Sequence, residues 1–181
     1  MGGNQAQTHR RKGPLLKRIA RFAILAAVVL LAFLAYQKLF PSDEKKIRKL
    51  LDSVAETVSF DAKEGNLSKV AAMTKFGGYF SADAVLTLHT PGGGVQEIRG
   101  RDELVELAKA VRWKLTSANV EFLDVTVAVD PSEESATSSL TAKATIAGEK
   151  DFFVQELKFS FKKLDGEWRI TQVETVRVFR Q

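Results

Sequence analysis

An uninterrupted apolar stretch near the N-terminus, Phe22 to Tyr36, constrains this chain more than any other feature. It reads FAILAAVVLLAFLAY and holds no charged or strongly polar side chain. As a helix it would cover a little over ~20 Å, and apolar neighbours extend it toward the ~30 Å thickness of a hydrocarbon core. Arg21 and Lys38 can extend their charged ends to the lipid headgroups. We therefore predict a transmembrane helix over residues 19–40, with the lipid bilayer as the partner of Phe22–Tyr36.

Charge is divided sharply between the two sides of this stretch. Of the 27 Lys and Arg residues, seven precede Pro41, and six of these lie before the apolar stretch, whereas all 22 Asp and Glu residues follow Pro41. Cytoplasmic flanks of membrane spans carry the excess of Lys and Arg. We therefore predict a single-pass protein of the cell membrane, with a basic cytoplasmic tail (residues 1–18) and a periplasmic or otherwise extracytoplasmic domain (residues 41–181).

The net charge of the predicted domain argues against one class of partner. The domain holds 20 cations and 22 anions, a net charge of −2, so the high isoelectric point of the whole chain belongs to the N-terminal tail. A nucleic-acid-binding domain is expected to carry a basic patch or stripe. We therefore expect no nucleic-acid partner.

Two alternatives stay open for the N-terminal region. A basic segment followed by ~15 apolar residues also describes a cleavable signal peptide. The end of the stretch, AFLAYQKLF, shows no pair of small residues spaced for cleavage, so we favour an uncleaved anchor. The second alternative reverses the topology and holds the domain at the cytoplasmic face. The absence of cysteine excludes disulfide bridges in either compartment.

Helical patterns dominate the first half of the predicted domain. Apolar residues recur with helical spacing after Ser42, which can cap a helix that ends near Gly65. Asn66 can then cap a shorter helix that ends near Met73, before a loop over residues 75–78. A third helix is predicted over residues 102–115. The apolar stripe of the first helix comprises Ile47, Leu50, Leu51, Val54, Val58 and Ala62, and that of the third comprises Leu104, Leu107, Ala108, Val111 and Leu115.

Alternation of apolar and polar residues predicts strands in the remainder. A strand through Leu86 and Leu88 is followed by a turn at Pro91–Gly94 and a short strand at Val95–Arg99. Three or four long antiparallel strands follow the third helix. Their alternation changes phase near Leu123-Asp124 and near Gln155-Glu156, which predicts two bulges, and Asp165-Gly166 predicts a tight hairpin. The opposite sheet face is expected to be polar, with Thr126, Thr141, Lys143, Thr145, Lys158, Ser160 and Lys162.

This order of elements resembles the nuclear transport factor 2-like (NTF2-like) superfamily, which includes SnoaL-like polyketide cyclases and ketosteroid isomerases. The resemblance implies an α+β domain of three helices on a curved, mostly antiparallel sheet, with a pocket inside the cone. It implies no activity, because one fold hosts many functions. The resemblance covers about Asp43 to Val178 and rests on EGNLSKVAAM between two helices, YFSADAVLTLH (Tyr79–His89), IRGRDEL (Ile98–Leu104) and DGEWRITQVET (Asp165–Thr175).

Four residues are candidates to line such a pocket. His89 is the only histidine of the domain and follows the first strand, where its protonation range suits a general base. Tyr79 is the domain's only tyrosine, and Trp113 lies on the third helix. Glu156 lies beside a predicted bulge, where burial would raise its pKa. Core packing or solvent exposure is the competing interpretation for each of them. One histidine, no cysteine and no close set of carboxylates predict no metal site. We also expect no cofactor.

Two functions follow as hypotheses. The first is a membrane-anchored binding or assembly module outside the cytoplasm, because no catalytic set of the isomerase type carries over to this sequence. Its partner would be a small apolar ligand, or a second copy or membrane-complex protein on the open sheet face. The second is a small-molecule enzyme of the isomerase, cyclase or hydrolase type, acting on an apolar substrate. It requires a cavity with at least two convergent polar groups.

Overall fold

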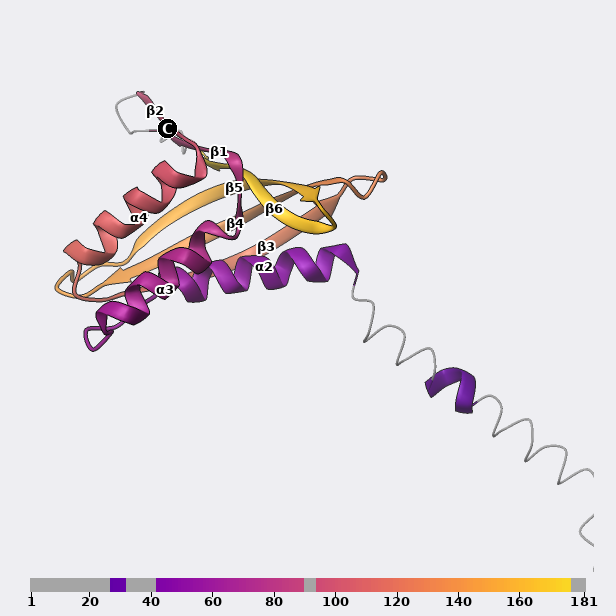
Figure 1. Cartoon of the computed structure of the whole chain (residues 1–181), viewed down its shortest axis with the longest axis horizontal. Coiled ribbons are helices and arrows are strands. Elements are labelled where there is room, and N and C mark those ends of the chain that lie inside the picture. Colours follow the sequence, from indigo (N-terminus) through magenta and orange to yellow (C-terminus); the bar gives the residue numbers. More distant parts are fainter. Residues whose placement is uncertain (1–26, 32–41, 90–93, 177–181) are drawn as a thin grey trace, which may run out of the picture. The chain divides into compact units, whose positions relative to one another are not determined.

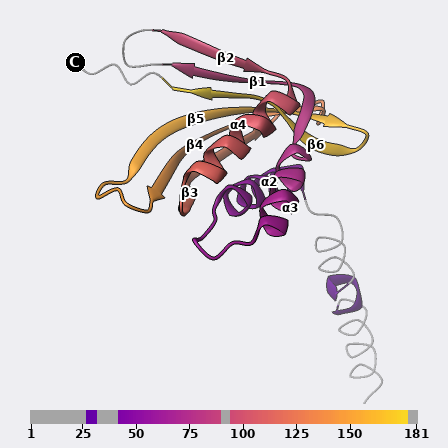
Figure 2. The same ribbon diagram turned by 60° about the vertical axis from the view of Figure 1, so that its left-hand side comes forward.

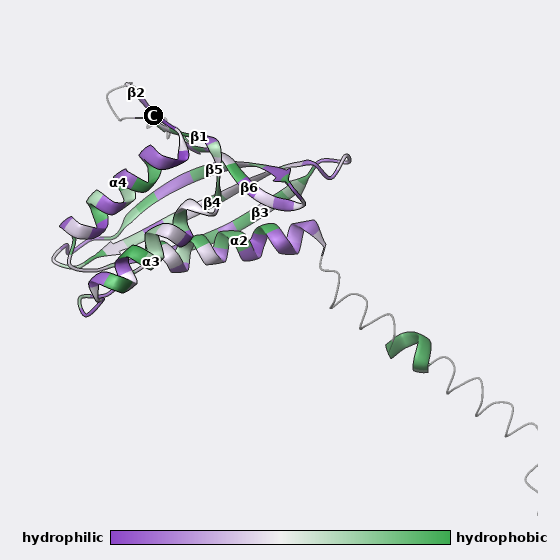
Figure 3. Cartoon of the chain, viewed as in Figure 1, coloured by the Kyte–Doolittle hydropathy of each residue, from purple (hydrophilic) through white to green (hydrophobic). Residues whose placement is uncertain are grey.

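The chain divides into two units, Met1–Ser42 and Asp43–Gln181. The computed structural model describes residues 27–31, 42–89 and 94–176. Residues 27–31 of the first unit are helical, exposed and apolar (Figure 3). Within the described ranges, no helix is long and apolar enough to cross a membrane. The basic tail, the remainder of the predicted span and the turn at residues 91–93 lie outside the described residues.

The second unit begins with helix α2 (Asp43–Val58). Its predicted apolar face is confirmed, since Ile47, Leu51 and Val54 are buried. The predicted extension to Gly65 is wrong. Phe60 leaves the helix and forms a two-way backbone bridge with Ala118, with N–O distances of 2.8 and 3.0 Å. Because this bridge requires extended backbone, α2 ends at Val58, and Ala62 lies in a turn.

Helices α3 (Asn66–Gly77) and α4 (Arg101–Lys114) pack against each other. The predicted cap at Asn66 is wrong, because Gly65 is the N-cap and makes no side-chain cap bond. The helix also continues through the predicted loop. A Cβ atom at Gly77 would lie 3.0 Å from Val105 Cγ2, so glycine permits the close approach of α3 to α4 at this point.

One six-stranded sheet carries the helices on one face, with strand order β2-β1-β6-β5-β4-β3 (Figure 1). All neighbours are antiparallel except β1 and β6, which are parallel. The sheet is strongly curved (Figure 2). The predicted α+β architecture, with three helices on a curved and mostly antiparallel sheet, is therefore confirmed. The strands are β1 (Phe80–His89), β2 (Val95–Arg99), β3 (Ala118–Val129), β4 (Ser135–Ile146), β5 (Phe153–Leu164) and β6 (Glu167–Thr175).

The turn and bulge predictions have mixed outcomes. The bulge near Leu123-Asp124 is confirmed by a register shift against β4 and by a positive φ of 53° at Asp124. The Asp165-Gly166 hairpin is also confirmed, with φ values of 51° and 81°. The bulge at Gln155-Glu156 is wrong, because β4 and β5 pair without interruption there. Exposed apolar side chains at residues 152–154 produced the apparent change of phase.

The two sheet faces differ as predicted. Along β5, Phe159 and Phe161 are buried under the helices, whereas Lys158 and Lys162 point to the other side and are exposed. The register continues this polarity across the sheet, since Lys158 is paired with Ser139 and Ser139 with Thr126. In the described part of the domain, the hydrophobic core therefore lies between the helices and the inner face of the sheet, and the outer face is mainly polar, with Leu123 and Val154 as exposed apolar exceptions.

Candidate functional site

A cavity of about 290 Å³ lies between the helices and the inner face of the sheet. Strand residues Leu86, Phe159 and Val173 line it on one side, and helix residues line the other. Of the described lining residues, all but Arg112 are apolar. The full lining comprises Val54, Val58, Phe60, Met73, Phe76, Phe80, Leu86, Leu104, Leu107, Ala108, Val111, Arg112, Phe159 and Val173.

The mouth of the cavity lies beside α4. Leu107 and Val111, one helical turn apart, both line the cavity, yet they are 40% and 46% exposed. Leu104, on the preceding turn, is buried. The cavity thus opens toward the C-terminal half of α4. The predicted apolar stripe of this helix is therefore divided between the core and the wall of an accessible cavity.

Arg112 is buried against the cavity, with only 3% of its surface exposed. Its guanidinium group forms a bidentate ion pair with Glu64, with Nε–Oε2 and Nη2–Oε1 distances of 2.8 and 2.5 Å. Nη1 also donates to the Thr57 carbonyl (2.8 Å), and Nη2 donates to the Ser59 carbonyl (3.4 Å). The guanidinium lies 4.7 Å from the centre of the Phe60 ring. A cation–π contact of this kind adds to the ion pair.

The sequence position of Arg112 explains why it is buried. Leu104, Ala108 and Arg112 are spaced by four residues, so they share one face of α4. Thr57 and Ser59 lie at the end of α2, where backbone carbonyls lack partners within the helix. A cation is favourable at this negative end of the helix dipole. Arg112 therefore connects α4 to the end of α2 and to the loop that carries Glu64.

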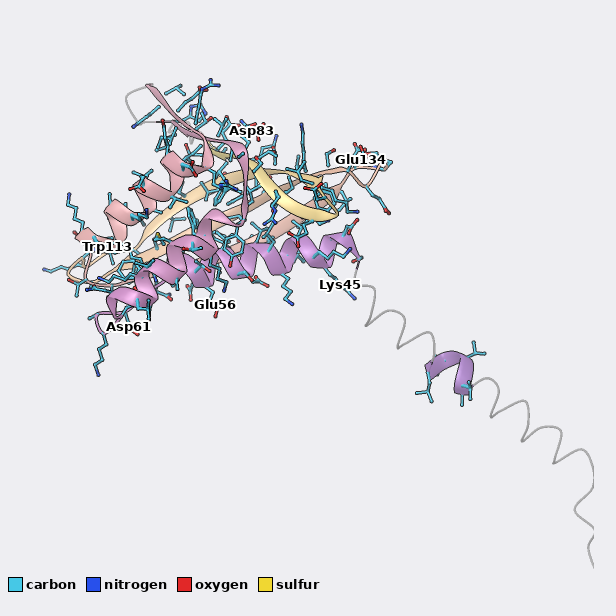
Figure 4. The ribbon with its side chains drawn as sticks, in the orientation of Figure 1. Lys45, Glu56, Asp61, Asp83, Trp113 and Glu134 are labelled. Atoms are coloured by element: carbon cyan, nitrogen blue, oxygen red, sulfur yellow. The ribbon has the colours of Figure 1, made fainter. Side chains whose placement is uncertain are left out.

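Tyr79 and Trp113 lie outside the set of residues that line the cavity. Tyr79 is buried, and its hydroxyl donates to the Ser53 carbonyl (3.2 Å) and lies 3.0 Å from Thr57 Oγ1. It therefore links the residue that precedes β1 to α2. Trp113 is 49% exposed at the C-terminal end of α4 (Figure 4), with Lys69 Nζ 5.6 Å from its ring centre.

His89 and Glu156 lie on the outer face of the sheet, opposite the cavity. His89 Nε2 is 2.9 Å from Glu174 Oε1, and the His89 backbone N–H donates to Thr175 Oγ1 (2.7 Å). Glu156 is exposed on β5, opposite Thr141 of β4. The structure therefore does not bring the four predicted pocket residues together in one site.

Sequence reasoning missed Arg112, the charged residue of the described cavity lining, and Glu64, its ion-pair partner. It gave neither residue a role in the pocket. One signal was available, because Arg112 interrupts the apolar face formed by Leu104 and Ala108. The aromatic side chains that line the cavity are those of Phe60, Phe76, Phe80 and Phe159. The described residues contain no cluster of three or more His, Cys, Asp or Glu that could hold a metal ion.

Comparisons with known proteins identify the fold of the domain, but no family and no activity. No family model matches the sequence, and no curated protein matches it. An NTF2-like protein with a cystatin-like fold from Novosphingobium aromaticivorans aligns with a TM-score of 0.60 and 15% identity, over 84% of this chain and 90% of that one. An NTF2-like protein of unknown function from Pseudomonas putida KT2440 aligns with a TM-score of 0.59 and 11% identity, over 76% and 88%.

A third similar structure is described as a candidate aromatic ring hydroxylase, also from N. aromaticivorans. It aligns with a TM-score of 0.60 and 16% identity, over 76% of this chain and 90% of that one. Identities this low show a shared fold and not a shared activity. The domain of this chain therefore has the NTF2-like cone fold.

Proposed function

We propose that this domain is a binding module that takes a small apolar ligand into the cavity of the cone. The observation that carries the proposal is an open cavity of about 290 Å³ whose described lining is apolar except for Arg112. Ligand sites are typically concave and lined by apolar and aromatic side chains. The exposed Leu107 and Val111 at the mouth give a ligand a route in from the surface.

Catalysis in the cavity is the less supported alternative. An enzyme needs a group that accepts or donates a proton within hydrogen-bond reach of the substrate. The guanidinium of Arg112 donates hydrogen bonds and has no acceptor atom, and the other described lining residues have no titratable side chain. The histidine and glutamate predicted for this role, His89 and Glu156, lie on the opposite face of the sheet.

The N-terminal region completes the proposal. Residues 22–36 hold the domain at a lipid bilayer, outside the cytoplasm, as an uncleaved single-pass anchor. The apolar stretch and the excess of Lys and Arg before it support this arrangement. The polar outer face of the sheet is the surface offered to a second copy of the chain or to a membrane-complex partner.

Filling the cavity tests the proposal. Ala108 lines the cavity, whereas Ala110, two residues further along α4, is exposed. Ala108→Phe places a ring inside the cavity, and Ala110→Phe adds the same group outside it. The full chain is reconstituted in phosphatidylcholine nanodiscs, and binding of 2-methylnaphthalene is measured by equilibrium dialysis against empty nanodiscs.

The expected result is binding by the wild type and by Ala110→Phe, with at least about tenfold weaker binding by Ala108→Phe. The comparison of the two variants removes the contribution of probe dissolved in the lipid, because both variants have the same lipid environment. Equal uptake by all three proteins would overturn the proposal.

A further inference from the structure

We infer that the cavity selects uncharged ligands of one or two rings and rejects anionic ligands of the same size, because Glu64 neutralises Arg112 from behind the cavity wall. This inference rests on the proposed binding function and gives it a ligand class. It also assigns Glu64 a role as a residue that determines specificity without lining the cavity.

The cavity volume sets the size of the ligand. An apolar cavity of about 150 Å³ holds one benzene molecule. The present cavity has about 290 Å³, which is sufficient for roughly two such rings. The aromatic side chains around it, Phe60, Phe76, Phe80 and Phe159, offer ring faces and edges for stacking.

The hydrogen bonds of the Arg112 guanidinium determine which ligand charge the cavity accepts. An exposed arginine in an apolar pocket would be the natural receptor for a carboxylate, which it binds through two parallel N–H groups. Here Glu64 already occupies that position through Nε and Nη2, and two backbone carbonyls take further N–H groups. Four of the five guanidinium N–H groups thus donate to the protein's own acceptors.

An anionic ligand would therefore meet no compensating charge. The other described lining residues are apolar, and burial of an unpaired carboxylate in such a site is strongly unfavourable. To form the two parallel bonds of a carboxylate–guanidinium pair, the ligand would have to displace Glu64 from Nε and Nη2, which would leave that carboxylate without its partner. Breaking a buried ion pair by removing one partner is costly. A neutral ligand encounters neither penalty.

The position of Glu64 makes the inference testable by one substitution. Glu64 is absent from the cavity lining and reaches the guanidinium from the loop between α2 and α3. Glu64→Gln retains a hydrogen-bond acceptor and removes the negative charge, so the positive charge of Arg112 becomes uncompensated beside the cavity. Glu106→Gln is the matched control, because Glu106 lies exposed on the same helix as Arg112 and forms an ion pair only with Lys109 in the described part of the chain.

The experiment compares 2-methylnaphthalene with 2-naphthoate, which is similar in size and ionised at pH 7. Both probes are dialysed against the full chain in phosphatidylcholine nanodiscs, and binding to Ala108→Phe is subtracted to isolate the cavity. We expect the wild type and Glu106→Gln to bind the neutral probe at least about tenfold more tightly than the anion. In Glu64→Gln, this ratio should fall at least about tenfold.

Each outcome has a distinct meaning. If the wild type binds 2-naphthoate as tightly as 2-methylnaphthalene, the inference is overturned and the binding function stands. If neither probe shows cavity-dependent binding, the proposed binding function is itself overturned, and the inference that rests on it is overturned as well. If Glu64→Gln binds the neutral probe normally but leaves the ratio unchanged, Glu64 is not the residue that sets it. Normal binding of the neutral probe by this variant also shows that its domain is folded.

Discussion

Arg112 occupies a helix position that the apolar pattern assigns to the core, and the carboxylate of Glu64 compensates its charge there. The Arg112–Glu64 pair spans 48 residues of sequence and joins α4 to the loop after α2. Ion pairs of this kind contribute little net stability compared with apolar packing, but the loss of one partner is costly. The same geometry therefore supports both the fold and the proposed ligand preference.

Removal of Arg112 should destabilise the domain. We expect Arg112→Ala to lower the free energy of unfolding by about 3 kcal/mol, because Glu64 and the end of α2 lose their donor. Urea unfolding followed by tryptophan fluorescence measures this change. Lys114→Ala, on an exposed position of the same helix, is the control and should change it by less than about 0.5 kcal/mol. Equal losses in the two variants would contradict this account.

Ser138 tests the converse case, a buried polar side chain whose removal should stabilise the domain. Its side chain is 2% exposed on the inner face of β4, and its hydroxyl has no hydrogen-bond partner among the described residues. Burial of an unpaired hydroxyl is unfavourable. Ser138→Ala should therefore raise the free energy of unfolding by about 0.5–1 kcal/mol. Ser139→Ala, on the exposed face of the same strand, should leave it nearly unchanged, and a destabilised Ser138→Ala would refute the argument.

At the scale of single elements, an ion pair between Asp43 and Lys163 connects the start of α2 to strand β5 of the sheet. Asp43 Oδ2 lies 2.6 Å from Lys163 Nζ of β5, and Asp43 Oδ1 lies 2.8 Å from Lys46 Nζ of the same helix. Together, the hydrogen bonds from Lys163 and then Lys46 hold the pKa of Asp43 far below its ordinary value of 3.8. The carboxylate is also favourable at the positive end of the helix dipole.

This lowered pKa predicts a pH dependence. A carboxyl whose pKa is lower in the folded state stabilises that state above its unfolded pKa, and the contribution disappears as the pH falls toward the folded pKa. The stability advantage of the wild type over Asp43→Asn should therefore be full at pH 6 and decrease below about pH 4. Urea unfolding of both proteins between pH 6 and pH 2.5 measures it. An advantage that stays constant over this range would exclude the Asp43–Lys163 pair as its source.

For the molecule as a whole, the proposed anchor can be tested without reference to the ligand. Val29 and Leu30 lie near the middle of the apolar stretch. A lysine at the centre of a membrane span costs about 2.5–3.5 kcal/mol, so Val29→Lys with Leu30→Lys should release the full chain from membranes during an alkaline carbonate wash. Val95→Lys with Leu67→Lys adds the same charges at exposed positions of the second unit and should leave the chain membrane-bound. If the chain with Val29→Lys and Leu30→Lys stays membrane-bound after the wash, as the control does, the proposed anchor is refuted.

Much of the fold could be predicted from the sequence because its signals are local. The burial of Ile47, Leu51 and Val54 follows from helical spacing, and the Asp165-Gly166 turn follows from the positive φ angles that these residues tolerate. Strand alternation correctly separated the polar face from the core face. Predictions failed where a distant contact overrode the local pattern, as at the end of α2, where Phe60 pairs with Ala118.

The sequence by itself determined the order of helices and strands, the two faces of the sheet and the apolar N-terminal stretch. These properties depend on residues within a few positions of each other, so periodicity and turn chemistry reveal them. Only the tertiary structure decided the site. It left a cavity unfilled, placed His89 and Glu156 on the far side of the sheet, and brought Glu64 to Arg112. These outcomes depend on how separate elements pack against each other. The Arg112–Glu64 pair, for example, joins residues 48 positions apart, and periodicity and turn chemistry reveal only contacts between residues a few positions apart.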